Sequence, residues 1–277
     1  MNGAYSGRQQ KLTTPSSVRP QPGDRSAYTV DYLFEGFPGK SATHGGLGWC
    51  TVSLVRGRGR VALIDTGRFG ARRLLIERLA QLGVSPADVT DVLLTHSHYD
   101  HSVNWTLFPT ARIQIGATEL DWALSQEWGS SVVPELYMRE LESWPNVTRL
   151  ADGDETLPSL VAHDTPGHTP GSMTFVLDLG EFDVVFAGDA VKNRSEWETR
   201  RAEFTIDAEA SASSIREIHS RWLAREGSVL VPGHDAPLVN RAGLFEQRQR
   251  QPATVTARLD REPSETKFEL KRPGSVT

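Results

Sequence analysis

The sequence Thr95-His96-Ser97-His98-Tyr99-Asp100-His101 brings three imidazoles and one carboxylate together within six residues. It follows directly after the apolar run Val92-Leu93-Leu94, which is typical of a buried strand. Buried strands usually end in turn residues, so four potential metal ligands at such an end call for an explanation. Neutral imidazole and carboxylate are the usual ligands of zinc and its first-row neighbours. We interpret the stretch as the first half of a metal site whose remaining ligands lie further along the chain.

Three further candidate ligands follow, each in a turn after an apolar run. His168 stands in a loop rich in proline and glycine, and Asp189 and His234 each follow a glycine at the end of a β-type run. Each has an ordinary structural explanation by itself, such as a helix cap or a turn. Because their joint occurrence with the histidine cluster is improbable by chance, we expect all of them at one metal centre.

The rest of the chain alternates between β-type runs and helical periodicity. Runs rich in β-branched and aromatic residues predict strands at 28–34, 49–55, 61–64, 91–95, 111–115, 159–162, 172–177, 183–186 and 229–231. Apolar residues at helical spacing predict helices at 71–82, 117–127, 134–144 and 209–226. This alternation is typical of a layered α/β fold.

Length and composition predict one globular domain with polar ends. The chain has 277 residues, of which 38% are apolar and 23% charged. We expect a flexible N-terminal arm at residues 1–26, a globular domain at 27–246 and a weakly ordered tail at 247–277. The single cysteine, Cys50, excludes an intramolecular disulfide framework and a thiolate-rich metal site. The two polar ends are compatible with an oligomer.

Charge and hydropathy argue against two classes of partner. A net charge of −5 and a pI near 5.9 argue against binding to nucleic acid, which depends on clustered Lys and Arg. No apolar run approaches the roughly 20 residues that a bilayer-spanning helix needs. Residues 1–24 lack the hydrophobic region of a secretory signal. We therefore expect a cytoplasmic protein that acts on a small molecule, with neither nucleic acid nor a membrane as partner.

In its ordered set of motifs the chain resembles the metallo-β-lactamase superfamily. The residues that carry the resemblance occur in the order expected for that superfamily: Asp65, His96, His98, Asp100, His101, His168, Asp189 and His234. The resemblance covers about residues 28 to 240. It implies an α/β (α+β) fold built as a four-layer αββα sandwich, in which two sheets face each other, helices cover both outer faces, and the site lies at one edge.

The resemblance also implies how two divalent metal ions are bound. The ligands form two sets with one bridging residue: His96, His98 and His168; Asp100, His101 and His234; and Asp189 between the sets. Asp65 is expected to orient a ligand imidazole rather than to bind metal itself. We expect zinc, with iron or manganese as the alternatives. Asp100 and Asp189 are the expected catalytic carboxylates, because they offset the charge of the ions and orient a bridging hydroxide.

Such a centre predicts hydrolysis by a metal-dependent enzyme. Two cations about 3.5–4 Å apart can share one water and lower its pKa toward neutrality, which supplies a nucleophile at pH 7. Four of the seven tryptophans stand in the segment 105–144, which favours a small apolar or aromatic ester or lactone as substrate. His44, Tyr99 and Trp105 are candidate substrate contacts.

Two departures refine the resemblance. Asp189 stands where true β-lactamases usually have a cysteine, so the pattern is closer to glyoxalase II-like thioesterases and acyl-homoserine-lactone lactonases. Relatives usually carry a glycine pair after the histidine cluster, whereas Ser102-Val103-Asn104-Trp105 stands here, so we expect a different pocket wall.

Three alternative functions stay open: a thioesterase of the glyoxalase II type, a hydrolase of an activated aryl ether, and, in a different class, an iron-dependent oxidoreductase. The oxidoreductase would contain iron when purified. A non-catalytic binding protein would be expected to have lost ligands, and none of the seven is missing.

Overall fold

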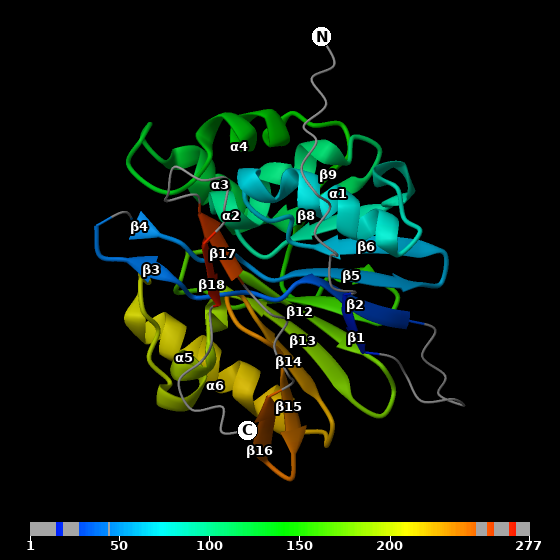
Figure 1. Cartoon of the computed structure of the whole chain (residues 1–277), viewed down its shortest axis with the longest axis vertical. Coiled ribbons are helices and arrows are strands. Elements are labelled where there is room, and N and C mark those ends of the chain that lie inside the picture. Colours follow the sequence, from blue (N-terminus) through cyan, green and yellow to red (C-terminus); the bar gives the residue numbers. More distant parts are fainter. Residues whose placement is uncertain (1–14, 19–27, 44, 248–253, 258–265, 270–277) are drawn as a thin grey trace.

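The computed structural model describes residues 15–18, 28–43, 45–247, 254–257 and 266–269. Two large sheets lie face to face, with α1, α3 and α4 on one outer side and α5 and α6 on the other (Figure 1). This arrangement confirms the predicted four-layer αββα sandwich. We describe the strands of each sheet in their spatial order, since neighbours in that order are hydrogen-bonded.

The first sheet contains seven strands. They are β1 (Ser16–Val18), β2 (Tyr28–Phe34), β5 (Val52–Gly57), β6 (Arg60–Ile64), β7 (Asp91–Leu94), β8 (Arg112–Gly116) and β9 (Val147–Leu150). The second sheet also contains seven: β10 (Glu155–Leu157), β11 (Leu160–Asp164), β12 (Met173–Asp178), β13 (Asp183–Gly188), β14 (Val229–Pro232), β15 (Leu238–Arg241) and β16 (Leu244–Gln247). Two small antiparallel pairs join β3 (Lys40–Ser41) to β4 (Gly45–Gly46) and β17 (Thr254–Ala257) to β18 (Thr266–Glu269).

The helices are α1 (Arg72–Gln81), α2 (Tyr99–Ser102), α3 (Ala117–Ser125), α4 (Glu135–Glu142), α5 (Arg194–Thr199) and α6 (Ala208–Leu223). None of the helices among the described residues combines the length and the apolar character that crossing a bilayer requires.

Both faces of each sheet are covered, so the central strands carry consecutive apolar residues that face both sides rather than one. In β7, Val92 and Leu94 pack under the first helical layer, while Leu93 faces the core between the sheets. In β13, Phe186 faces that same central core, while Val185 packs against α6. Each fully buried side chain of this kind contributes about 1.5–3 kcal/mol relative to leaving it exposed. Continuous apolar runs therefore decide the fold.

Strand direction determines where the functional loops emerge. β6, β7 and β8 run parallel in the first sheet, and β13 and β14 run parallel in the second. The carboxyl ends of parallel neighbours lie at the same edge of a sheet. The loops after Ile64, Leu94, Gly188 and Pro232 therefore leave the sandwich at one edge, as the resemblance implied.

Several short elements were not predicted. Among them are α2, β3, β4, β9, β10, β15, β16 and α5, each of six residues or fewer, which is too short for a clear periodic pattern. Within the range predicted as an arm, Ser16–Val18 pairs with β2, and within the predicted tail β17 pairs with β18. The domain limits at residues 27 and 246 remain a prediction.

Candidate metal centre

The structure gathers the seven predicted ligands at the loop edge of the sandwich. Those of the histidine cluster follow β7, His168 lies in the loop between β11 and β12, and Asp189 and His234 follow β13 and β14. Their ligand atoms form three overlapping groups that could each hold a metal ion: His96, His98 and His168; His96, His101 and Asp189; and Asp100, His101 and His234. Residues up to 138 positions apart in the chain thus meet because parallel strands end together.

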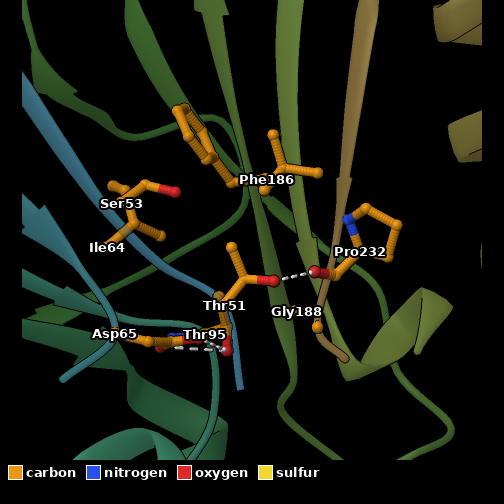
Figure 2. Close-up of a pocket in the computed structure, with 10 residues that line it drawn as sticks. Thr51, Ser53, Ile64, Asp65, Thr95, Phe186, Gly188 and Pro232 are labelled. Carbon is orange, nitrogen blue, oxygen red and sulfur yellow. Dashed lines mark hydrogen bonds between the residues drawn. The ribbon is translucent and has the colours of Figure 1, made fainter. Parts of the chain in front are cut away.

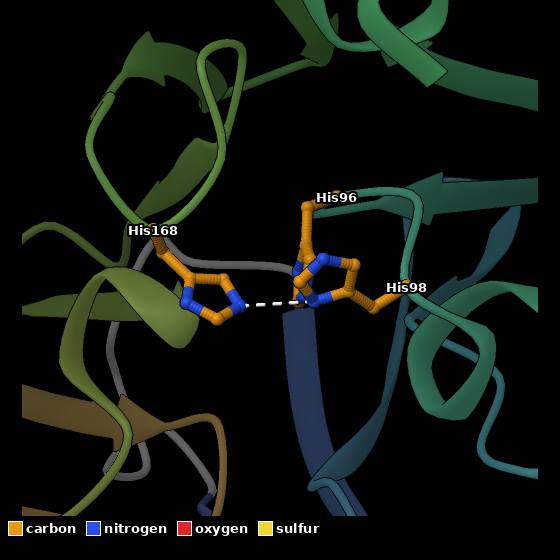
Figure 3. Close-up of side chains that lie close together, drawn as sticks. All are labelled: His96, His98 and His168. Atoms are coloured by element: carbon orange, nitrogen blue, oxygen red, sulfur yellow. Dashed lines mark hydrogen bonds between the residues drawn. The ribbon is translucent and has the colours of Figure 1, made fainter. Parts of the chain in front are cut away.

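The first group, which we call the three-histidine group, consists of His96, His98 and His168 (Figure 3). The centroids of the three rings lie 4.6 to 4.9 Å from one another. Nε2 of His168 lies 3.0 Å from Nδ1 of His98. Nε2 of His96 is buried and has no hydrogen-bond partner among the described residues. An unpartnered buried ring nitrogen pointing into a histidine cluster is the expected state of a metal ligand seen without its metal.

The second group, which we call the mixed group, consists of Asp100, His101 and His234. The Nε2 atoms of the two histidines lie 3.3 Å apart, and Oδ2 of Asp100 lies 3.8 Å from the first and 3.5 Å from the second. The thiol of Cys50 donates to the backbone carbonyl of Asp100 at 2.9 Å. Burial raises the pKa of that thiol, so Cys50 is a buried donor that holds the loop in place.

The carboxylate of Asp189 lies between the two groups. Its Oδ1 lies 3.3 Å from Nε2 of both His101 and His234, whereas its Oδ2 lies 3.3 Å from Nε2 of His168. Ligand atoms of a tetrahedral zinc site, at 2.0–2.1 Å from the ion, are separated by about 3.3 Å. The spacing within both groups is therefore the spacing that a small divalent cation requires.

Backbone carbonyls orient two of the imidazoles. Nδ1 of His168 donates to the carbonyl of Phe204 at 3.0 Å, and Nδ1 of His234 donates to the carbonyl of Trp49 at 3.1 Å. Since a carbonyl can only accept, these contacts place the proton on Nδ1 and leave the lone pair of Nε2 directed at the centre.

A carboxylate orients the third. Oδ2 of Asp65 lies 2.7 Å from Nδ1 of His101, and the same carboxylate accepts hydrogen bonds from the backbone N–H and the hydroxyl of Thr95. The hydroxyl of Thr95 also lies 3.1 Å from Nδ1 of His96. Asp65 itself has φ of 58°, an uncommon conformation for a residue other than glycine. These contacts fix both rings before any ligand arrives.

Proton affinities differ between the groups. Burial lowers the pKa of His98 to about 4 and that of His168 to about 3, and it holds the pKa of His96 well below its usual range. Burial also disfavours charge on His101 and His234, but the neighbouring Asp189 carboxylate raises the pKa of both. The three-histidine group is thus neutral at pH 7 and ready to bind a cation.

The mixed group shows why positive charge is needed here. Burial disfavours the Asp189 carboxylate, yet His234, His101 and His168 hold its pKa well below its usual range. With neutral rings, two nitrogen lone pairs and two carboxylate oxygens would face one another across 3.3 to 3.8 Å. Protons or a cation must offset this repulsion. The donor set therefore fits a divalent metal ion, which would replace those protons.

Glycine is required where the loops that carry Asp189 and His234 touch. A Cβ added to Gly233 would lie 2.1 Å from Oδ1 of Asp189, so no side chain fits between the carboxylate and the backbone. Gly188 has φ of +51° and lies against Thr95, which leaves no room for a Cβ either. These two glycines allow Asp189 to sit at the junction of both sheets.

A small pocket lies between the sheets behind the centre (Figure 2). Thr51 spans it, donating its hydroxyl to the carbonyl of Pro232 at 2.7 Å and its N–H to the carbonyl of Gly233 at 2.6 Å. Asp65 and Thr95 line the other side. Every residue that lines the pocket is buried, so its polar groups support the loop that carries His234 instead of receiving a substrate.

The candidate substrate contacts differ in their positions. Tyr99 is partly exposed beside the three-histidine group, and its N–H donates to the carbonyl of Val132 at 3.1 Å. Trp105 is fully buried and packs edge-on against Trp144, so it presents no surface to a substrate in this structure. His44 lies outside the described residues.

The segment that departs from the superfamily pattern, residues 102–105, is fully buried. Ser102 donates its hydroxyl to the carbonyl of His98, and the side-chain amide of Asn104 donates to the carbonyls of residues 66, 67 and 68. The expectation of a different pocket wall is therefore wrong for these side chains. Through its hydrogen bonds, Asn104 anchors the loop that follows Asp65.

Sequence reasoning missed several residues that hold the centre. Glu119, a fully buried carboxylate at the start of α3, bonds to both loops of the three-histidine group. Its only signal in the sequence is a helix start directly after an apolar strand. Lys192 lies 3.0 Å from buried Glu196, and its positive charge adds a smaller effect to the burial that lowers the pKa of His98 and His168. The carbonyls of Trp49 and Phe204 carry no sequence signal, because every residue has one.

Comparisons with known proteins agree with this geometry. The family model of the metallo-beta-lactamase superfamily matches residues 45–234. YobT of Bacillus subtilis is 35% identical over 198 residues, which cover 65% of this chain and 81% of that protein. The N-acyl homoserine lactonase AttM of Agrobacterium fabrum is 25% identical over 173 residues, and the match spans 58% of this chain and 63% of the lactonase.

A solved structure shows the same fold. AidC, a dizinc quorum-quenching lactonase solved in complex with a product, superposes with a TM-score of 0.66. The match covers 87% of this chain and 99% of AidC, at 16% sequence identity. At that identity the likeness concerns the fold alone.

Proposed function

Because this chain belongs to the metallo-beta-lactamase superfamily, we propose that it is a dinuclear enzyme that hydrolyses a small apolar or aromatic ester or lactone. Lactonases among its relatives support a metal-dependent hydrolase. The observation that carries the dinuclear assignment is the position of Asp189, whose two oxygens each lie 3.3 Å from a different group of imidazoles. One carboxylate shared in this way makes one centre out of two neighbouring sites.

In this proposal the residues divide between the two ions as the resemblance implies. The three-histidine group would hold one ion, the mixed group would hold the other, and Asp189 would contact both. We propose zinc, since imidazole and carboxylate donors at tetrahedral spacing suit it and AidC is a dizinc lactonase. When bound, the two ions supply Lewis acidity toward the substrate carbonyl and a water of lowered pKa.

The chain's own residues supply order and charge. Asp100 and Asp189 offset part of the positive charge, and their free lone pairs accept hydrogen bonds that orient the attacking water. Hydrogen bonds to Asp65, Phe204 and Trp49 fix the imidazoles in advance, so the site does not have to reorganise during the reaction. His96, His101, His168 and Asp189 are buried, and His98 and His234 are partly buried, which strengthens the electrostatic interactions among them.

An apolar rim supports the proposed substrate class. We define this rim as Tyr99, Val132, Phe204 and Ile206, which are 39%, 52%, 75% and 60% exposed. Tyr99 and Val132 are joined by a backbone hydrogen bond next to His98, and Phe204 is joined by its carbonyl to His168. Large apolar side chains exposed on both sides of a polar centre are typical of a binding site for an apolar ligand.

Metal analysis and a substrate screen test this proposal. Purified protein is expected to contain about two zinc ions per chain and to hydrolyse lactones or aryl esters faster than thioesters and activated aryl ethers. One metal ion or none per chain would overturn the dinuclear assignment. Faster thioester cleavage would favour the glyoxalase II type of activity. Bound iron together with oxygen-dependent turnover would favour an oxidoreductase.

A further inference from the structure

Glu119 is a fully buried carboxylate in the first turn of α3, and four donors surround it. Its Oε1 accepts from the backbone N–H of Ser97 at 2.8 Å and from the hydroxyl of the same residue at 2.7 Å. Its Oε2 accepts from the hydroxyl of Thr169 at 2.6 Å and from the N–H of Gly171 at 3.2 Å. Both oxygens are therefore satisfied, and neither touches a predicted ligand directly.

Each oxygen holds a different loop. Ser97 stands between His96 and His98, so Oε1 fixes the loop that carries two members of the three-histidine group. Thr169 follows His168, so Oε2 fixes the loop that carries the third member. One side chain thus sets the separation between two loops that come from different sheets.

Backbone packing at the same point supports this role. A Cβ added to Gly171 would lie 2.1 Å from the backbone nitrogen of Glu119, so the His168 loop rests directly on the first turn of α3. A Cβ added to Gly116, just before that helix, would lie 2.8 Å from the carbonyl oxygen of Gly171. The His168 loop and the first turn of α3 are thus in tight backbone contact, and the Glu119 carboxylate adds hydrogen bonds between them.

A buried charge carries a desolvation penalty that a purely structural contact does not require. Burying an ionised carboxylate is unfavourable unless charge-assisted hydrogen bonds compensate it, and a neutral side chain could join a helix to a loop without that penalty. A carboxylate can accept on both oxygens from two loops at once, which neither an amide nor a hydroxyl can do. The choice of residue therefore points to the need for fixed geometry between the loops.

We propose that Glu119 is a positioning residue for the metal ion of the three-histidine group, holding His96 and His98 at the correct distance from His168. This inference rests on the proposed dinuclear function. It assigns Glu119 to one ion only, because its four hydrogen bonds reach the loops of His96, His98 and His168, whereas the rings of the mixed group are oriented by Asp65 and Trp49.

Glu119→Gln is the direct test. The amide keeps the shape of the side chain but turns a donor toward either Ser97 or Gly171, both of which are themselves donors. We expect one of the two zinc dissociation constants, measured by titration against a chromophoric chelator, to weaken by about 10–100-fold while the other stays within about twofold. Cobalt substitution should show the same selectivity, with the absorption of one of two cobalt ions changed.

Thr169→Val and Thr169→Ser form a second, milder pair. Valine removes the hydroxyl that donates to Oε2 and should weaken the same constant, whereas serine keeps it and should restore wild-type binding. This pair keeps the test valid even if Glu119→Gln does not fold. Asp91→Asn is the matched control: Asp91 is a fully buried carboxylate at the opposite end of β7, bonded to Arg112 and Gln114. It should lower the melting temperature and leave both constants unchanged.

The outcomes separate the two proposals. If wild-type protein binds fewer than two zinc ions, the dinuclear function fails. If wild-type protein binds two and Glu119→Gln or Thr169→Val leaves both constants unchanged, the positioning role fails while the function stands. Equal weakening of both constants would also overturn the positioning role, because it would indicate general loosening of the fold.

Discussion

The three-histidine group and the mixed group share Asp189 but differ in charge and in how they are held. The first consists of neutral imidazoles whose pKa burial lowers, and its own three residues carry no charge. The second includes the carboxylate of Asp100 and two histidines whose pKa neighbouring carboxylates raise against the effect of burial. A cation in the first group therefore depends on Asp189 for charge compensation more than a cation in the second group does.

The two groups also differ in how a carboxylate outside the centre supports them. His101 bonds directly to the carboxylate of Asp65 at 2.7 Å, which makes that imidazole a stronger donor to metal. The three-histidine group has no such direct contact with a carboxylate outside the centre; its carboxylate, Glu119, acts on the backbone and hydroxyl groups of the loops. The Asp65 carboxylate thus supports the mixed group by bonding to the His101 ring, whereas the Glu119 carboxylate supports the three-histidine group by holding its loops in position.

Asp189→Ala should have the largest effect, because it removes the one residue common to both groups. Loss of several kcal/mol of charge stabilisation corresponds to a decrease in kcat of at least about a thousandfold. We expect hydrolysis to fall below detection and the metal content to drop below two per chain, with the three-histidine group losing its ion first. Steady-state kinetics and elemental analysis measure both.

Asp183→Asn is the control for this substitution. Asp183 begins the same strand, β13, and its carboxylate bonds to Arg225 far from the centre. Activity and metal content should match the wild type, and circular dichroism should show that both variants are folded. Full activity with two metals in Asp189→Ala would remove the bridging role of Asp189.

Asp65→Asn should have an intermediate effect that is confined to the mixed group. The asparagine must still accept from the backbone N–H of Thr95, so its amide turns toward Nδ1 of His101, which is itself a donor. The ring would then change tautomer or rotate away. We expect the zinc affinity of the mixed group to fall by about 10–100-fold with the other constant unchanged.

This variant is the counterpart of Glu119→Gln. Together the two should weaken opposite constants, and a double variant should weaken both. If Asp65→Asn instead weakens the three-histidine group, through the contact between Thr95 and His96, then Asp65 supports the centre as a whole and the division into two separately held groups is wrong.

The sequence predicted the fold, and it singled out the seven residues that the structure gathers at one edge, because both depend on patterns that are local in the chain. Buried strands such as β7 and β13 contain apolar runs, and a potential metal ligand follows each within two residues, His96 after β7 and Asp189 after β13. The short strands β9 and β10 lack such a pattern. Their register depends on neighbouring strands that lie elsewhere in the sequence.

What the sequence did not reveal is how the ligands are oriented. The acceptors for His168 and His234 are backbone carbonyls, and the role of Glu119 exists only because two loops from different sheets meet at one helix. Trp105 was expected at the substrate pocket on the basis of its position after the histidine cluster. Instead, Trp105 lies in the short 3-10 helix Val103–Leu107, and its side chain is fully buried under the first helical layer.

Phe204→Ala should have the smallest effect, and it separates binding of substrate from binding of metal. The backbone carbonyl that accepts from His168 remains, so both zinc constants should be unchanged. The lost side chain is an exposed part of the apolar rim, and its contact with a substrate is worth at most about 1.5–3 kcal/mol, so KM for long-chain esters should rise about three- to tenfold. Short-chain esters that do not reach the rim should show no change, and kcat should stay the same.

Leu244→Ala, which removes an equally exposed apolar side chain on the edge strand β16, should leave KM unaltered for every substrate. A fall in kcat with constant KM would instead mean that Phe204 supports the three-histidine group through its packing, which would extend the supports of that group to the apolar rim.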